Sequence, residues 1–156
     1  MIYPKHFTLQ ELVYPKLYEK YKGNKEWLLW RKFNPQFLLT LDTLRDEFGI
    51  AVVNNWSLGK ISWLGNQIFQ YSGVRPEVAP EGEYWSPETM HTLYNTADVK
   101  FKKCSDVEDY NKIRKFICDH TGMFPFVTVL EKNINWLHFS TGNFENNNGS
   151  IRMINR

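Results

Sequence analysis

The segment NPQFLLTLDTLRDEFGI, residues 34–50, limits the possible folds more than any other stretch of this chain. Asn34 followed by Pro35 is a helix-start signal, and Gly49 is a helix-stop signal. Between them, one helix face carries apolar side chains at helical spacing: Phe37, Leu38, Leu41, Leu44 and Phe48. The pattern predicts an amphipathic helix, and the β-branched run IAVVNNW after it predicts a short strand.

The chain before this helix contains another helix signal. Thr8 precedes Glu11 by three residues, the spacing of a capping box, so we predict a first helix from about Leu9 to Tyr21. Residues 57–88 are rich in Gly, Ser, Pro and Trp and have no sustained period, which indicates a long ordered loop. Loops of this length in compact domains often carry function.

The C-terminal half predicts strands around one helix. TADVKFK alternates like a strand, and Ser105 with Glu108 forms a second capping-box pattern before a helix with Gly122 at its exit. FPFVTVLE and NWLHFST are two predicted strands joined by the polar KNIN, which favours a hairpin. The Asn-rich tail GNFENNNGSIRMINR is expected to be irregular.

Composition and charge narrow the class of protein. The 156 residues fit one domain with its own core, and 42% hydrophobic with 16% aromatic residues argue against disorder. A net charge of +2, with 19 basic residues dispersed among 17 acidic ones, provides no basic stripe, so we expect no nucleic-acid partner. The start, MIYPKHFTLQELVYPK, has no signal-peptide pattern, and no apolar stretch approaches the length of a membrane span.

Two of the four histidines stand in a context that suggests metal binding. His91 and Asp98 flank a turn before a predicted strand, and His138 lies within another strand. Two imidazoles and one carboxylate, with a fourth position open to water, form the ligand set of catalytic zinc sites. Spacing alone leaves a structural role open for each of them, because an isolated histidine is more often a core or surface residue than a ligand.

The segments around these residues resemble one known family. HTLYNTAD is similar to the H-x-x-G-x-A-x-D motif of the zinc peptidases that include D-alanyl-D-alanine carboxypeptidases and phage endolysins. NWLHFST resembles the W-x-H strand of that family. The blocks VVNNW, QYSGVR and VTVLE, with the opening HFTLQELV, look like a phage-encoded branch of it. The resemblance covers most of the chain, in short blocks.

The resemblance implies a fold and a metal site. The fold is α+β, with helices packed on a small, mainly antiparallel sheet that carries a single zinc site. We expect one domain over residues 1–156, with a helical N-terminal part at 1–49 and a metal-site core at 50–142. His91, Asp98 and His138 are implied as ligands of one Zn²⁺ per chain, an ion that lowers the pKa of a coordinated water to about 7 and polarises a scissile carbonyl.

The family pattern also assigns roles to residues outside the ligand set. Arg75 aligns with an arginine that contacts substrate or stabilises oxyanion charge, and its alternative is a surface salt bridge. Asn135 stands where many members carry the acidic general base. An amide cannot accept a proton at neutral pH, so Asn135 is expected to position water or substrate. Trp136 is expected to contact substrate, and Tyr94 occupies the position of the family's glycine.

The general base then has to come from another residue. Glu131 is the first candidate, because it matches a glutamate of the phage branch and the predicted hairpin can bring it near His138. Its alternative is an exposed charge at a strand end. Glu83 and Glu88, in the loop before His91, are further candidates.

Two functions follow from these residues. The first is a zinc metallopeptidase that hydrolyses an amide bond in bacterial cell-wall peptide, phage-encoded as an endolysin or a virion-associated enzyme. It would be synthesised in the host cytoplasm and act at the cell wall or within a phage particle. The second is a catalytically impaired metal-binding protein with a structural or interaction role among phage virion proteins, an alternative that the departure at Asn135 favours.

Overall fold

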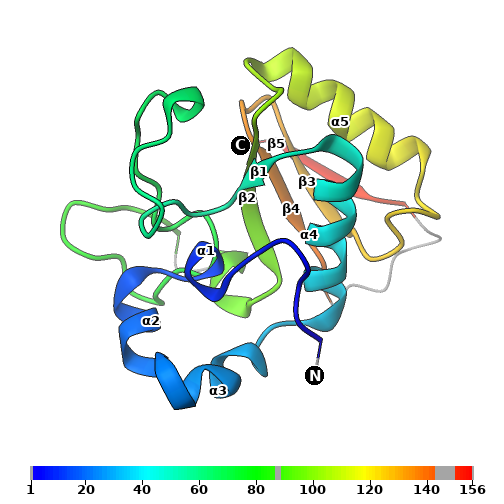
Figure 1. Ribbon diagram of the computed structural model, residues 1–156. Coiled ribbons are helices and arrows are strands. Elements are labelled where there is room, and N and C mark those ends of the chain that lie inside the picture. The colour runs from blue at the N-terminus through cyan, green and yellow to red at the C-terminus, as the bar shows by residue number, and fades with distance from the viewer. Residues whose placement is uncertain (1, 87–88, 143–149, 156) are drawn as a thin grey trace.

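A computed structural model of the chain describes residues 2–86, 89–142 and 150–155. These residues form an α+β fold in which helices pack on a five-stranded sheet (Figure 1). The N-terminal third is helical, and its elements in order are α1 (Leu9–Leu12), α2 (Pro15–Tyr21), the 3-10 turn η1 (Gly23–Lys25), α3 (Glu26–Trp30) and α4 (Pro35–Phe48). The predicted helix at residues 35–48 is confirmed: the Asn34 side chain caps its start by accepting a bond from the Gln36 N–H.

The single helix expected from Leu9 to Tyr21 is wrong, because the chain is extended at Val13 and Tyr14. Pro15 opens α2, and the ring of a proline disfavours helical geometry at the residue before it. The break exposes the Val13 carbonyl, which accepts bonds from the side chains of Asn54 and Trp56. The interruption therefore ties the N-terminal helices to the segment after β1 (Ala51–Val52).

The sheet has the strand order β1-β2-β4-β3-β5, with β2 (Thr96–Phe101), β3 (Val129–Lys132), β4 (Leu137–Ser140) and β5 (Arg152–Asn155). The predicted hairpin of β3 and β4 is confirmed. The irregular tail is wrong at residues 152–155, which form a strand parallel to β3, while residues 143–149 lie outside the described part. All other strand pairs are antiparallel, so the sheet is mixed.

Helix α5 (Val107–Asp119) starts one residue away from the predicted capping box. Asp106, not Ser105, is the N-cap, and its carboxylate accepts the Asp109 N–H. The helix then packs with α4 against one face of the sheet. The Phe37 ring of α4 stacks on Phe139 of β4 at a centroid distance of 5.5 Å, and this contact belongs to the continuous apolar core.

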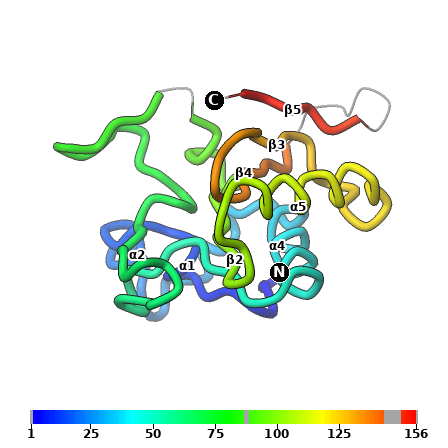
Figure 2. The backbone as a smooth tube through the Cα atoms, turned by 90° about the horizontal axis from the view of Figure 1, so that it is seen from above, coloured from blue at the N-terminus to red at the C-terminus, as the bar shows by residue number. Residues whose placement is uncertain are grey.

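The two faces of the sheet have different covers. Figure 2 shows α4 and α5 on one side of the sheet and the long green loop on the other. Because side chains alternate along a strand, Ala97 and Val99 of β2 enter the core beneath the helices, whereas Asp98 and Lys100 project from the opposite face. The loop side therefore receives the polar residues of the sheet.

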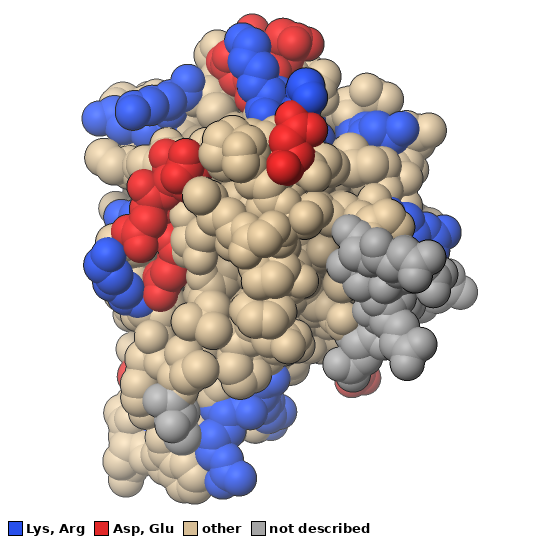
Figure 3. Space-filling model, turned by 90° about the vertical axis from the view of Figure 1, so that its right-hand side faces the viewer, with Lys and Arg blue, Asp and Glu red and all other residues tan. Residues whose placement is uncertain are grey.

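The distribution of charge on the surface and the lengths of the helices bear on possible partners. On the face shown in Figure 3, acidic and basic side chains lie near one another around a broad uncharged area, so this face has no stripe of a single charge. Within the described residues, no helix combines the length and the apolar character that crossing a membrane requires.

Candidate metal centre

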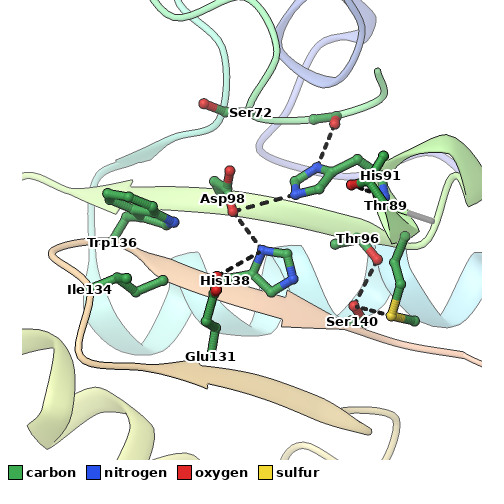
Figure 4. Close-up of polar contacts among 12 residues, drawn as sticks. Ser72, Thr89, His91, Thr96, Asp98, Glu131, Ile134, Trp136, His138 and Ser140 are labelled. Carbon is green, nitrogen blue, oxygen red and sulfur yellow. Dashed lines mark hydrogen bonds and ion pairs between the residues drawn. The ribbon is translucent and has the colours of Figure 1, made fainter. Parts of the chain in front are cut away.

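Asp98 and His138 face each other on neighbouring strands. Their Cα atoms are paired in the antiparallel register of β2 and β4, and both side chains project toward the loop side of the sheet. His91 comes from η3 (Met90–Leu93), a 3-10 turn that ends shortly before β2 begins. Figure 4 shows the three side chains converging on one point.

The distances within this cluster suit a single metal ion. Oδ1 of Asp98 lies 2.7 Å from Nδ1 of His138 and 3.5 Å from Nε2 of His91. One ligand atom from each residue lies within 4.8 Å of the other two. Atoms that bind one zinc ion tetrahedrally, at about 2.1 Å each, are about 3.4 Å apart. The three side chains can therefore hold a metal ion after small movements.

The hydrogen bond of His91 fixes which nitrogen faces the cluster. Its Nδ1 lies 2.8 Å from the carbonyl oxygen of Gly73, which can only accept, so Nδ1 carries the proton and Nε2 presents its lone pair to Asp98. Burial lowers the pKa of His91, which favours the neutral form of the ring. A lone pair and a carboxylate that face each other repel unless a cation lies between them, and this donor set therefore fits a metal ion.

Gly73 can stand where it does because it has no side chain. A Cβ atom at this position would lie 2.2 Å from the carbonyl oxygen of Leu12. The same carbonyl accepts the Val74 N–H at 2.8 Å, which fixes the loop against the N-terminal helices. Gly73 therefore controls the place of the His91 ring, a role that the SGVR block contained but sequence reasoning missed.

Two further residues that sequence reasoning missed, Asn54 and Asn55, position the loop beside Asp98. The buried Asn54 accepts the Ser72 N–H at 2.8 Å, and the Ser72 carbonyl accepts the Asp98 N–H at 2.7 Å. The neighbouring Asn55 binds the backbone of the long loop at Gly59, Gln67 and Phe69. The NNW block is therefore structural: its side chains shape the loop that covers the site.

Asp98 is ionised and fully engaged. Burial works against its charge, but the adjacent His91 and His138 outweigh burial and hold the pKa of this carboxyl well below its usual value. Its Oδ2 accepts a bond from Nη2 of Arg75 at 2.7 Å. Arg75 also donates from Nε to the Tyr71 carbonyl and lies over the Trp85 ring. This is a largely buried ion pair and not the surface salt bridge considered as the alternative for Arg75.

Glu131 is the candidate base that the fold brings to the cluster. Its Oε2 lies 3.8 Å from Nδ1 of His138, and its side chain is 13% exposed, so it is not a free charge at a strand end. Glu83 is exposed and does not line the cavity at the cluster. Glu88 lies outside the described residues.

The two residues expected to contact substrate occupy different places. Asn135 is exposed in the turn between β3 and β4 and lines a separate cavity. Trp136 lines that cavity and also the one at the His91, Asp98 and His138 cluster. Tyr94 has left-handed backbone geometry, with φ 57° and ψ 29°, the region that a glycine adopts without strain. A tyrosine at this position is strained in its backbone, and its ring makes an edge contact with the Phe33 ring at a centroid distance of 5.3 Å.

A cavity of about 470 Å³ opens above the cluster. Its polar wall includes the candidate ligands, Arg75 and Glu131, and its remaining lining is Tyr84, Trp85, Ser86, Thr89, Met90, Trp136 and Ile154. Fold and site together define an α+β domain with a buried two-histidine, one-aspartate cluster at the base of an open cavity. Compared with known proteins, the chain matches no family model, no curated protein and no solved structure.

Proposed function

We propose that this chain is a zinc-dependent peptidase that hydrolyses an amide bond in bacterial peptidoglycan peptide. One observation carries the proposal: His91, Asp98 and His138 converge at the base of a cavity, with the Glu131 carboxylate 3.8 Å from His138. A carboxylate next to a metal cluster, inside a cavity large enough for a peptide, is the arrangement that hydrolysis requires. The motif resemblance supports the choice of zinc and of cell-wall peptide.

The residues have separate roles in this mechanism. When bound, the zinc ion supplies Lewis acidity, which activates water and polarises the carbonyl. Glu131 accepts a proton from water as its oxygen adds to the carbonyl carbon, and returns that proton to the leaving nitrogen as the C–N bond breaks. Arg75 presents its guanidinium at the cavity wall, where charge develops on the carbonyl oxygen or where a substrate carboxylate binds.

Metal analysis tests the ligand assignment. We expect about one zinc per chain by mass spectrometry of the purified protein, and loss of that zinc in His91→Ala and in His138→Ala. His120→Ala is the matched control, because His120 is exposed and its side chain bonds only to its own helix within the described residues. Stoichiometric zinc in both cluster variants would overturn the ligand set.

Hydrolysis is tested on purified peptidoglycan, with mass spectrometry of the released fragments. Wild-type protein should release peptide fragments, and a chelator should stop the release. Glu131→Gln should keep zinc but lower the rate by about a hundredfold or more, the effect of losing a general base. Glu108→Gln, an exposed glutamate on α5, should keep the full rate.

A second candidate function is a metal-binding structural or interaction protein of a phage virion. It is favoured by Asn135, which stands where the peptidases carry their base and lies away from the cluster. Zinc binding without release of fragments from several wall chemotypes would support this candidate over hydrolysis.

A further inference from the structure

A second cavity lies beside the candidate metal centre, and the two share Trp136 in their lining. Its volume is about 320 Å³, within the range of small-molecule sites. Trp136 lines both cavities, and Figure 4 shows its indole next to Asp98. A ligand that extends from the metal cluster across Trp136 therefore enters the second cavity.

The second cavity has aromatic walls and one charged lining residue among those described. Lys100 supplies that charge, and no aspartate or glutamate lines the cavity. Asp106 and Asp109, which follow the lining residue Ser105, bond to the start of α5 and are not part of the lining. The other lining side chains are uncharged: Trp63, Leu64, Gln67, Phe69, Phe101, Cys104, Ser105, Tyr110, Asn135 and Trp136.

Lys100 is held in place by contacts with uncharged groups, and the charge of Asp98 acts on it only from beyond salt-bridge distance. Its ammonium donates to the Ser72 hydroxyl at 2.7 Å and lies 4.1 Å from the centre of the Phe69 ring. Within the described part of the chain, no salt bridge of Lys100 is found, although Asp98 is two residues away. A positioned ammonium with a neutral hydrogen-bond acceptor and an aromatic face is equipped to bind an anion.

The spacing of Lys100 from the metal ligand sets a length for that ligand. Two residues along a strand on one face are about 6.6 Å apart. The same length corresponds to about two residues of an extended peptide. A carboxylate roughly two residues from the scissile bond would therefore reach Lys100 when that bond lies at the cluster.

We propose that the cavity lined by Lys100 and Trp136 is a subsite for a substrate carboxylate about two residues from the bond that is cleaved. This inference rests on the proposed function for the identity of the substrate, a cell-wall stem peptide. It adds a preference within that class: peptides with a free carboxylate at this distance bind better than the same peptides carrying a carboxamide.

The test compares three forms of the tetrapeptide L-Ala-γ-D-Glu-L-Lys-D-Ala by calorimetric titration of the full-length protein. One form has both carboxylates, one is amidated at the glutamate α-carboxyl, and one is amidated at the C-terminus. Mass spectrometry checks that the peptide stays intact, and Glu131→Gln replaces wild type if it does not. We expect one of the two amidated forms to bind about tenfold or more weakly, the size of a lost charge-assisted bond.

Lys100→Met should remove this preference and bind the acid and the amides alike. Lys102→Met is the matched control, because Lys102 is an exposed lysine just beyond the end of β2, and it should keep the preference. Thermal unfolding checks that both variants fold. The proposal is overturned if wild type binds all three forms equally, if no form binds at millimolar concentration, or if Lys100→Met keeps the preference.

Zinc content and peptidoglycan hydrolysis are measured on the same samples, so the two proposals can fail separately. If the protein prefers the acid through Lys100 but cleaves nothing, the subsite proposal stands and the peptidase proposal fails. If the protein cleaves the wall but shows no preference for the acid, the peptidase proposal stands and the subsite proposal fails.

Discussion

The two cavities that meet at Trp136 have opposite electrostatics. At the candidate metal site, the Asp98 carboxylate is enclosed by His91, His138 and the cationic Arg75. In the second cavity, the Ser72 hydroxyl is the one hydrogen-bond partner of the Lys100 ammonium among the described residues, and burial lowers the pKa of Lys100 to about 8 although the charge of Asp98 raises it. The first arrangement is suited to hold a cation tightly, and the second to receive an anion.

The difference arises from one strand and one loop. Asp98 and Lys100 share a face of β2, and Ser72 contacts both, through its carbonyl and its hydroxyl respectively. Two residues on one face of the same strand thus line two cavities, and the loop contacts one of them through a backbone carbonyl and the other through a side-chain hydroxyl. The predictions below ask whether the two cavities are energetically independent, and they run from the largest expected effect to the smallest.

Asp98→Ala should have the largest effect. It leaves the Arg75 guanidinium without the carboxylate that it pairs with, and removing one partner of a buried ion pair costs about 3–5 kcal/mol. Denaturant unfolding should show this loss, and zinc should be absent by mass spectrometry. Lys100→Met should retain full zinc. Loss of zinc in Lys100→Met as well would mean that the two cavities form one site.

Gly73→Ala should have the next largest effect, and its direct effect should be on the candidate metal site. The added methyl would meet the Leu12 carbonyl at 2.2 Å, so the loop must move and carry the His91 acceptor with it. We expect a destabilisation of about 1–3 kcal/mol and zinc affinity lowered by about tenfold to a hundredfold. Gly122→Ala is the control, because nothing lies within 4 Å of a Cβ at that position. Unchanged zinc affinity in Gly73→Ala would remove Gly73 from the support of the site.

How far the sequence predicts this architecture depends on where each signal lies. The helix over residues 35–48 was predictable because its start, stop and apolar stripe are all local, at Asn34, Gly49 and the residues between them. The strand at residues 152–155 was not, because its order comes from parallel pairing with β3, a contact that no local pattern encodes. The break at Val13 and Tyr14 has a local signal in Pro15, which disfavours helical geometry at the residue before it.

The candidate site divides in the same way. His91, Asp98 and His138 were singled out because ligand types at motif spacing are visible in a sequence. Lys100 was not, because a lysine in a strand has no distinguishing pattern until the fold places it in a cavity without carboxylates. Asn135 was expected at the site, but the turn that carries it faces the other cavity.

Arg114→Lys should have a smaller effect, and one that reaches both cavities. The buried Arg114 donates from Nη2 to the carbonyls of Ile134 and Trp136, and so holds the turn that carries the shared indole. Arg114 also donates from Nη1 to the Asn111 side chain, and a lysine with its single nitrogen cannot make all three bonds. We therefore expect a loss of about 1–2 kcal/mol in urea unfolding and a changed tryptophan emission. Arg152→Lys, at an exposed arginine of β5, is the control. If Arg114→Lys changes the binding of zinc alone or of the peptide alone, the result would contradict the shared role of Trp136.

The smallest predicted effect is a pH dependence of the unfolding free energy, and it should arise from the candidate metal site. In metal-free protein, the buried His91 has a pKa lowered from 6.5, so the unfolded chain binds more protons than the folded one as pH falls through 6.5. Unfolding free energy should therefore decrease between pH 7 and pH 5, by less than the roughly 1.4 kcal/mol per pH unit of one full proton. Asp98, with its pKa well below 3.8, adds a loss only at lower pH.

His91→Gln should flatten this slope, because glutamine has no charge to gain and its amide can still donate to the Gly73 carbonyl. Lys100→Met should leave the slope unchanged between pH 7 and pH 5, where the ammonium of Lys100 is protonated in both states. Urea titrations at four pH values in the presence of a chelator measure all three proteins. If Lys100→Met and His91→Gln alter the slope equally, the acid response belongs to both cavities, and their electrostatic separation along β2 is wrong.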